Sequence, residues 1–118
     1  MNTRRGDIVM CSFPFSDMSG SKLRPALVVM DNAFQKLHHS ILAFISSSRS
    51  RFVGDPSQLV IDPLHADWSQ SGLRVPSVVQ CEFLTSLHKD LIHHKLGELS
   101  DATMRGIDEC LRSALGLR

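Results

Sequence analysis

Five short apolar runs, each ended within a few residues by a turn-forming residue, constrain the fold of this chain more than any other feature. The runs cover residues 7–13, 25–30, 40–46, 58–62 and 77–83. Short runs rich in β-branched residues and bounded by Pro, Gly, Ser or Asp are typical of β-strands. The third run is apolar throughout, which predicts a strand that is buried on both faces. Residues 85–94 are ambiguous and predict a short helical turn followed by a further strand.

One helix is expected near the C-terminus, over residues 101–115. Ser100 is a good N-cap, Asp101 in the first turn suits the helix dipole, and Gly116 is a natural stop. Apolar residues recur at helical spacing and form one face: Met104, Ile107, Cys110, Leu111, Ala114 and Leu115. Five or six short strands followed by one helix predict a mainly β fold, with a small, strongly bent sheet or barrel against which the helix packs.

Length and composition limit the class of protein. The 118 residues predict a single domain over residues 1–118, because one hydrophobic core typically spans about 100–150 residues. Hydrophobic residues make up 42% and charged residues 21% of the chain, which excludes a disordered protein. The longest apolar runs are far shorter than the roughly 20 residues of a membrane-spanning helix. The N-terminus has no apolar stretch typical of a signal peptide, so we expect a cytoplasmic protein without membrane attachment.

The charge is unevenly distributed along the chain. The formal net charge is +1, but residues 1–51 carry seven basic and three acidic side chains, whereas residues 52–118 carry six basic and nine acidic ones. This excess of Arg and Lys could present a positive surface to a phosphate backbone. The alternative is that folding mixes both halves on the surface and the asymmetry has no function.

The cysteines and histidines do not predict a metal site. Cys11, Cys81 and Cys110 are widely spaced, which is typical of reduced, buried thiols in a cytosolic protein. Two pairs of histidines are adjacent in sequence, at residues 38–39 and 93–94. Adjacent side chains point apart on strands and helices, so such a pair seldom supplies two ligands to one metal.

Two positions are candidates for phosphate chemistry. Arg24 lies between a glycine-containing polar loop and an apolar strand, and its planar guanidinium matches phosphate geometry. Ser46 ends the third apolar run, where its hydroxyl could bind a phosphate oxygen. The alternatives are an ordinary surface arginine and a polar strand end. Trp68 could stack on a base or pack on the core, and Glu82 could be an acid or base or a solvated carboxylate.

Three stretches in chain order resemble the MazF/PemK family of toxins. They are Arg-Gly-Asp-Ile-Val at residues 5–9, Arg-Pro-Ala-Leu-Val-Val at residues 24–29, and Leu-Gly-Glu-Leu-Ser at residues 96–100 ahead of the expected helix. Residues 43–46 and 77–91 resemble further strands of the family. The resemblance therefore covers nearly the whole chain.

This resemblance implies a fold and an activity. The fold would be an SH3-like small β-barrel of the CcdB/MazF/PemK type with a C-terminal helix, and the protein would be a homodimer. The activity would be that of a type II toxin: a metal-independent, sequence-specific endoribonuclease, without a cofactor, that cleaves single-stranded mRNA. The RNA 2′-hydroxyl would attack the adjacent phosphorus, giving 2′,3′-cyclic phosphate and 5′-hydroxyl ends. The protein partner would be a cognate antitoxin.

The family's catalytic residues match two positions of this chain. Arg24 matches the arginine that precedes proline, and Ser46 matches a threonine of the family and keeps its hydroxyl. The resemblance implies RNA binding near these residues, at Ser19, Lys22, Ser47, Arg49, Glu82 and His88. Small β-barrels contact bases through variable loops, here expected at residues 15–23, 47–56 and 63–76.

The chain departs from the common family pattern at three of its positions. Ser19 replaces a glutamate five residues before the arginine, and Thr85 and His88 replace an arginine and an aspartate. Two other hypotheses therefore stay open. One is a catalytically weak or inactive binding protein with the toxin fold. The other is a CcdB-like gyrase-binding toxin, which is less favoured because its tail contains tryptophan, whereas the only tryptophan here is Trp68.

Overall fold

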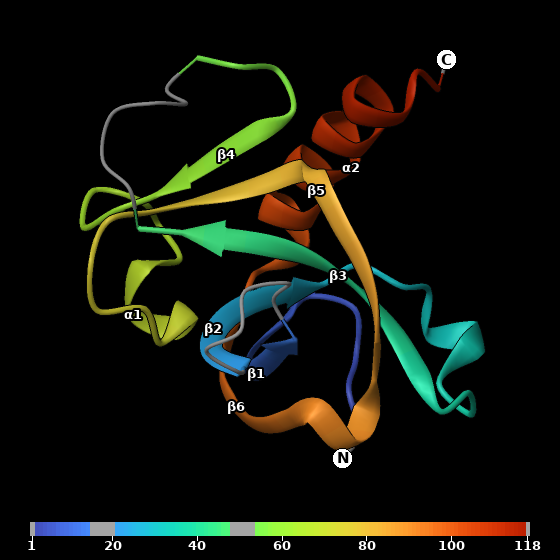
Figure 1. Ribbon diagram of the computed structural model, residues 1–118. Coiled ribbons are helices and arrows are strands. Elements are labelled where there is room, and N and C mark those ends of the chain that lie inside the picture. The colour runs from blue at the N-terminus through green and yellow to red at the C-terminus, as the bar shows by residue number, and fades with distance from the viewer. Residues whose placement is uncertain (1, 15–20, 48–53, 118) are drawn as a thin grey trace.

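Six strands form one antiparallel sheet in the computed structural model, which describes residues 2–14, 21–47 and 54–117 (Figure 1). The strands are β1 (Asp7–Pro14), β2 (Ser21–Val28), β3 (His39–Ser46), β4 (Gln58–Ile61), β5 (Ser77–His88) and β6 (Ile92–Glu98). Their order across the sheet is β4-β5-β3-β2-β1-β6. Neighbouring strands are therefore sequential along the chain or joined by short crossovers.

The mainly β class with one C-terminal helix is confirmed, and the sheet is strongly bent (Figure 1). Its hydrogen-bonded order is nevertheless open, because β4 and β6 remain edge strands among the described residues. The bend comes largely from β5, whose pairing with β3 shifts register between Ala43 and Phe44. This shift leaves residues 81–83 as a bulge, and bulges increase the local bend and twist of a strand.

The sheet separates two apolar clusters. On one face, Ile8, Leu27, Ala43 and Ile45 form a core with the C-terminal helix. On the other face, inside the bend, Val9, Ala26, Val28 and Leu42 form a second core. Successive residues of a strand point to opposite faces, so β3 supplies both clusters. The prediction that this strand is buried on both faces is confirmed.

The C-terminal helix α2 (Asp101–Leu115) also matches its prediction. The Ser100 hydroxyl accepts a hydrogen bond from the Thr103 amide at 3.2 Å, and Gly116 ends the helix with a φ of 69°. Its buried residues are Met104, Ile107 and Cys110. The helix packs on β4 and β5. All three cysteines are free and buried, as expected.

Two segments differ from the prediction. Residues 63–76 include a short helix, α1 (Trp68–Ser71), where only a connection was expected. The helical turn expected from residue 85 begins later, as η2 (Lys89–Leu91), because β5 continues to His88 through its pairing with β3. A second helical turn, η1 (Asn32–Phe34), connects β2 and β3. No helix in the described part of the chain is long and apolar enough to cross a membrane.

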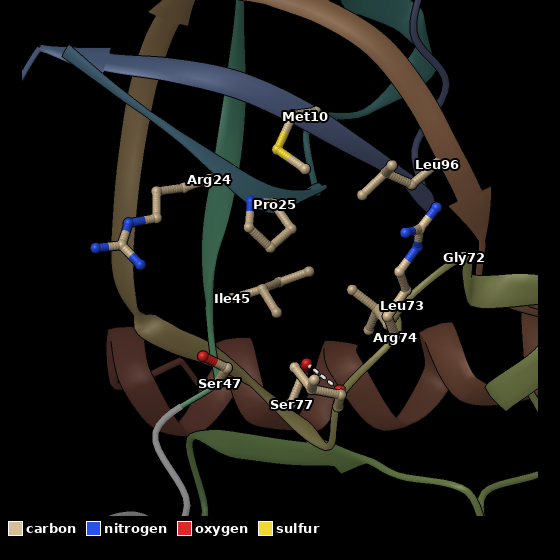
Figure 2. Close-up of a pocket in the computed structure, with 11 residues that line it drawn as sticks. Met10, Arg24, Pro25, Ile45, Ser47, Gly72, Leu73, Arg74, Ser77 and Leu96 are labelled. Carbon is tan, nitrogen blue, oxygen red and sulfur yellow. Dashed lines mark hydrogen bonds between the residues drawn. The ribbon is translucent and has the colours of Figure 1, made fainter.

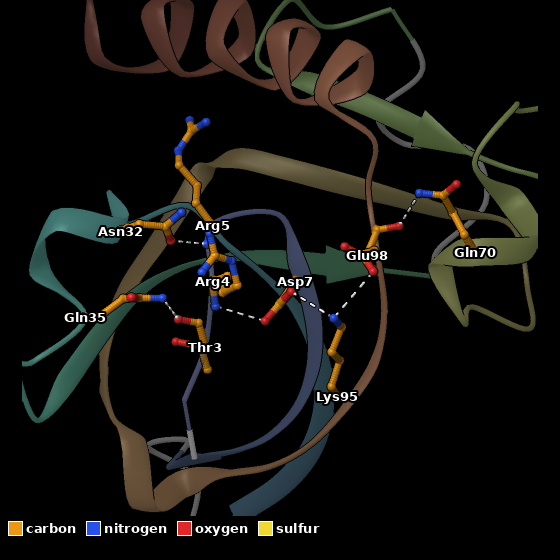
Figure 3. A network of polar contacts seen from close by, with 9 residues as sticks. All are labelled: Thr3, Arg4, Arg5, Asp7, Asn32, Gln35, Gln70, Lys95 and Glu98. Atoms are coloured by element: carbon orange, nitrogen blue, oxygen red, sulfur yellow. Dashed lines mark hydrogen bonds and ion pairs between the residues drawn. The ribbon is translucent and has the colours of Figure 1, made fainter.

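The Arg-Gly-Asp motif is part of the framework of the fold. The Arg5 guanidinium donates from Nε to the Val29 carbonyl at 2.9 Å and pairs with Asp108 of α2 at 2.5 Å. The Arg5 amide donates to Asn32 Oδ1 at 2.7 Å (Figure 3). Gly6 has a φ of 100°, a left-handed conformation that favours glycine.

Asp7 completes this corner of the molecule. It is buried, and its carboxylate accepts from the Arg4 amide at 2.9 Å and pairs with Lys95 of β6 at 3.3 Å (Figure 3). Lys95 also lies 3.6 Å from Glu98. The hydrogen bond and charge of Asp7 outweigh desolvation and raise the pKa of Lys95. We call residues 4–7 with these partners the N-terminal corner.

Candidate active site

The structure brings Arg24 and Ser46 to the same end of neighbouring strands. Ala26 of β2 lies opposite Phe44 of β3 in an antiparallel register. Continuing this register by one alternation places Arg24 across from Ser46, on the same face of the sheet. Neighbouring strands are about 4.8 Å apart, so the two predicted catalytic residues are close although they are distant in sequence.

The Arg24 side chain is partly buried but has no partner among the described residues. Its Nε is buried and makes no hydrogen bond to any described atom. A buried, unsatisfied charged donor costs free energy, and most such groups in native proteins are satisfied. Arg24 is therefore available to an anion that arrives from outside the fold.

A cavity of about 230 Å³ lies beside Arg24, and we call it the Arg24 pocket (Figure 2). Its walls are mostly apolar and come from four parts of the chain: Met10, Pro25, Ile45, Leu73, Val75 and Leu96. Ser47 and Ser77 add hydroxyl groups, and no acidic residue lines the pocket. Figure 2 shows the guanidinium groups of Arg24 and Arg74 on opposite sides of the pocket.

Arg74 was not identified from the sequence. It lies in the connection over residues 63–76, which was expected to contact bases, and it follows Gly72 and Leu73. Its side chain is exposed and makes no hydrogen bond or ion pair to the described residues. A cation two residues after a glycine in a predicted binding loop was the only available signal.

Two glycines place the segment that carries Arg74. A Cβ on Gly72 would lie 2.1 Å from the Leu96 carbonyl oxygen, and one on Gly97 would lie 2.1 Å from that of Gln70. Gly72 also has a φ of 73°. The end of α1 and β6 therefore touch backbone to backbone, which only glycine allows. We call this the Gly72–Gly97 contact.

Glu82 lies in the β5 bulge with its carboxylate bound by neutral side chains. It accepts hydrogen bonds from Ser57 Oγ at 2.9 Å, Gln58 Nε2 at 2.5 Å and Gln80 Nε2 at 3.4 Å. Burial alone would raise its pKa, but these hydrogen bonds together lower the pKa of Glu82 below its usual value. The group is an ionised acceptor near neutral pH.

The other predicted site residues are placed unevenly. Lys22 is exposed on β2, one alternation from Arg24, and Ser47 lines the pocket. His88 is not brought to this site: it pairs with His39 at the opposite end of β3 from Ser46. There its ring stacks on His38 with a centroid distance of 6.2 Å. Ser19 and Arg49 lie outside the described residues.

Several alternatives raised by the sequence receive an answer. Trp68 is partly buried and packs against the core beneath α2, which confirms the packing interpretation. Burial raises the pKa of Cys11 and Cys81 to about 12, so both are neutral thiols and poor nucleophiles at neutral pH. Within residues 2–14, 21–47 and 54–117, no group of three or more His, Cys, Asp or Glu side chains could hold a metal ion.

The fold and this pocket define a small, mainly β protein with an anion-accepting site at one end of its sheet. Residues 4–115 match the family model described as PemK-like, MazF-like toxin of type II toxin-antitoxin systems. The chain therefore belongs to this toxin family, and the sequence resemblance is confirmed.

Solved structures share the fold over nearly the full length. An endoribonuclease from a mycobacterial species, in complex with its cognate antitoxin, is 25% identical, covering 98% of this chain and 97% of its own with a TM-score of 0.74. The Mycobacterium tuberculosis toxin MazF-mt6 is 20% identical, with 95% and 98% covered and a TM-score of 0.76. A MazE-MazF structure from Deinococcus radiodurans is 19% identical, with 100% of both chains covered and a TM-score of 0.75.

Proposed function

We propose that this toxin is a metal-independent endoribonuclease that cleaves single-stranded RNA, mRNA in particular, at a short sequence. The observation that carries the proposal is the position of Arg24, opposite Ser46 and with its buried Nε unpartnered among the described residues. Membership of the toxin family and the similarity to a mycobacterial endoribonuclease support it.

In the proposed reaction the RNA supplies its own nucleophile. The 2′-hydroxyl loses its proton and its oxygen attacks the adjacent phosphorus. The bond to the 5′-oxygen of the next nucleotide breaks, and that oxygen takes up a proton. The products are a 2′,3′-cyclic phosphate and a 5′-hydroxyl. The protein has to orient the RNA, stabilise the extra negative charge on the five-coordinate phosphorus and support the two proton transfers.

Arg24 suits the electrostatic part of this work. Its guanidinium is permanently charged and offers several donors in one plane to the non-bridging phosphate oxygens. Ser46 offers a hydroxyl to the same phosphate from the adjacent strand. Lys22, Ser47 and Glu82 would contact RNA around this centre, together with Ser19 and Arg49 in the segments outside the described residues.

The proposed assembly follows the same family. The protein partner would be a cognate antitoxin that blocks the RNA site, as type II toxins require. Two of the similar structures support this partner, since one is a complex with a cognate antitoxin and another a MazE-MazF structure. We propose that the chain is a single domain, acts as a homodimer and works in the cytoplasm, where its RNA substrate is found.

The test is a cleavage assay with mapped products. The purified protein, free of antitoxin and in EDTA, is incubated with a long RNA of known sequence, and new 5′ ends are mapped by primer extension. Arg24→Met and the exposed-arginine control Arg105→Met are assayed in parallel. We expect discrete cuts with 5′-hydroxyl ends that disappear in Arg24→Met and persist in Arg105→Met. A folded wild-type protein that leaves several long RNAs intact would instead favour a non-catalytic binding protein.

A further inference from the structure

The Arg24 pocket has the chemistry of a nucleotide site rather than of a bare phosphate site. Resting on the proposed ribonuclease function, we infer that the pocket takes one unpaired base of the RNA beside the scissile phosphate. Arg74 binds a neighbouring phosphate, and so helps to determine which nucleotide is accepted. Arg74 is thus a specificity residue of the substrate-binding site, separate from the catalytic Arg24.

The walls of the pocket suit the flat faces of a base. Met10 and Leu96 lie on one side and Pro25 and Ile45 on another, around about 230 Å³ of space (Figure 2). Unstacked bases of single-stranded RNA bind in this way, between apolar or aromatic side chains. A thioether such as that of Met10 makes favourable contacts with an aromatic ring. The hydroxyls of Ser47 and Ser77 supply polar atoms at the rim for the base edge.

The two arginines suit the phosphates on either side of that base. In an RNA strand each nucleoside lies between two phosphates, and Arg24 and Arg74 lie on opposite sides of the pocket (Figure 2). Neither side chain forms an ion pair with a described carboxylate, and no acidic residue lines the pocket. An apolar peptide side chain would satisfy the walls alone, whereas a nucleotide satisfies the walls and both cations.

The pocket is also held in shape before any ligand binds. The Gly72–Gly97 contact presses the Arg74 segment onto β6. The Ser71 hydroxyl donates to the Trp68 carbonyl at 2.7 Å and accepts from the Leu73 amide at 3.1 Å. A wall placed in this way loses little conformational entropy when a base enters.

Occupancy of the pocket can be observed without any cleavage. The protein is labelled with ¹³C-methyl methionine, and the Met10 signal is assigned with Met10→Leu. Uridine and adenosine 3′-monophosphates are titrated in, with inorganic phosphate as the probe that lacks a base. We expect at least one nucleotide to shift the Met10 methyl signal, while phosphate does not. The Met30 and Met104 signals serve as internal controls, because these residues do not line the pocket.

Substitution of Arg74 tests its role in selection. We expect Arg74→Ala to weaken the nucleotide response about tenfold or more, as for loss of one charge-assisted hydrogen-bonding group. In cleavage of a short RNA the KM should rise by a similar factor with kcat little changed, and base preference at one position should relax. Arg74→Lys should fall between the two, since it keeps the charge without the planar fork. The control Arg105→Ala removes an equal charge from α2 and should change nothing.

The outcomes separate this inference from the proposed function. If the wild-type protein cleaves RNA but Met10 ignores every nucleotide and Arg74→Ala cleaves normally, the pocket inference is wrong and the ribonuclease stands. If no RNA is cleaved while Met10 still responds to nucleotides and the response depends on Arg74, the pocket is a nucleotide site and the ribonuclease proposal is wrong. A Met10 shift caused only by antitoxin-derived peptide would overturn the RNA assignment.

Discussion

Arg5 and Arg24 belong to two motifs of the same family resemblance, yet they have opposite surroundings. The Arg5 guanidinium is bound within the fold by the Val29 carbonyl and the Asp108 carboxylate. The Arg24 guanidinium has no such partner among the described residues, and its Nε is buried without one. A charge that the fold satisfies stabilises the fold, whereas a charge that it leaves unsatisfied is free to bind a ligand.

The same contrast extends to the regions around the two arginines. The N-terminal corner joins β1, β6 and α2 through Asp7, Lys95 and Asp108, and its glycine has the conformation that the turn requires. The Arg24 pocket has apolar walls and two arginines with no described acidic partner. The first region should therefore respond to substitution through stability, and the second through binding and catalysis.

Replacing Arg24 should give the largest effect and the clearest separation of the two. We expect Arg24→Met to lower the RNA cleavage rate by about 10²–10³-fold, as for loss of one electrostatic contact to a transition state. The free energy of unfolding should stay within about 0.5 kcal/mol of the wild type. Cleavage kinetics and urea unfolding measure the two quantities. A large loss of stability in Arg24→Met would mean that this arginine is a framework residue like Arg5.

The Gly72–Gly97 contact should be the most sensitive part of the framework near the pocket. Gly97→Ala places a Cβ against the Gln70 carbonyl oxygen, so we expect the free energy of unfolding to fall by about 3 kcal/mol or more. Thermal unfolding measures the change. Gly116→Ala is the control, because its Cβ meets nothing within 4 Å and only the positive φ is strained. Equal losses in the two variants would contradict the close backbone approach.

Arg5 should matter for stability and not for the chemistry. Arg5→Met loses the bond to the Val29 carbonyl and the partly buried pair with Asp108, and we expect a loss of about 2 kcal/mol in the free energy of unfolding. Cleavage per folded molecule should match the wild type. Arg105→Met, on the exposed face of α2, controls for the charge removed. Loss of cleavage without loss of stability would reverse the comparison between the two arginines.

A buried carboxylate gives the framework a pH dependence. Asp67 accepts from the Ser100 amide at 2.8 Å and the Ser100 hydroxyl at 2.9 Å. Burial would raise its pKa, but the hydrogen bonds of Ser100 and Thr103 and the charge of His65 together lower it. Because the pKa of Asp67 is lower in the folded state, its contribution is full above the unfolded value of about 4 and is lost as pH falls through the folded value.

We therefore expect Asp67→Asn to lower the free energy of unfolding by about 1–3 kcal/mol at neutral pH. The difference from the wild type should shrink as the pH is lowered below about 4. Urea unfolding across the pH range checks this, with the exposed Asp55→Asn as control. A difference that is constant with pH would show that the charge of Asp67 contributes nothing.

Local sequence patterns anticipated most of the elements. Ser100 and Gly116 correctly delimited α2, since a cap depends on a few neighbouring residues. The apolar run at residues 40–46 correctly predicted a strand buried on both faces. The end of β5 was missed, because its continuation past residue 83 depends on pairing with β3 and on a bulge that no local pattern encodes. The small helix α1 was missed for a similar reason, since four residues carry little periodicity.

The candidate site was only partly accessible in the same way. Arg24 and Ser46 were found through their strand ends and the family resemblance, and the register of β2 and β3 brings them together. His88 was grouped with them, yet the same register places it at the far end of β3. Arg74 was missed because its position depends on a backbone contact between segments that are far apart in sequence.

The sequence by itself determined the mainly β class, the C-terminal helix, the family and the two residues on which the proposed chemistry depends. Each of these follows from short-range periodicity, capping or motif. Only the tertiary structure decided which charges are satisfied within the fold and which are left for a ligand. That distinction needs the distances between side chains on different strands, and these distances exist only after the sheet has formed its register.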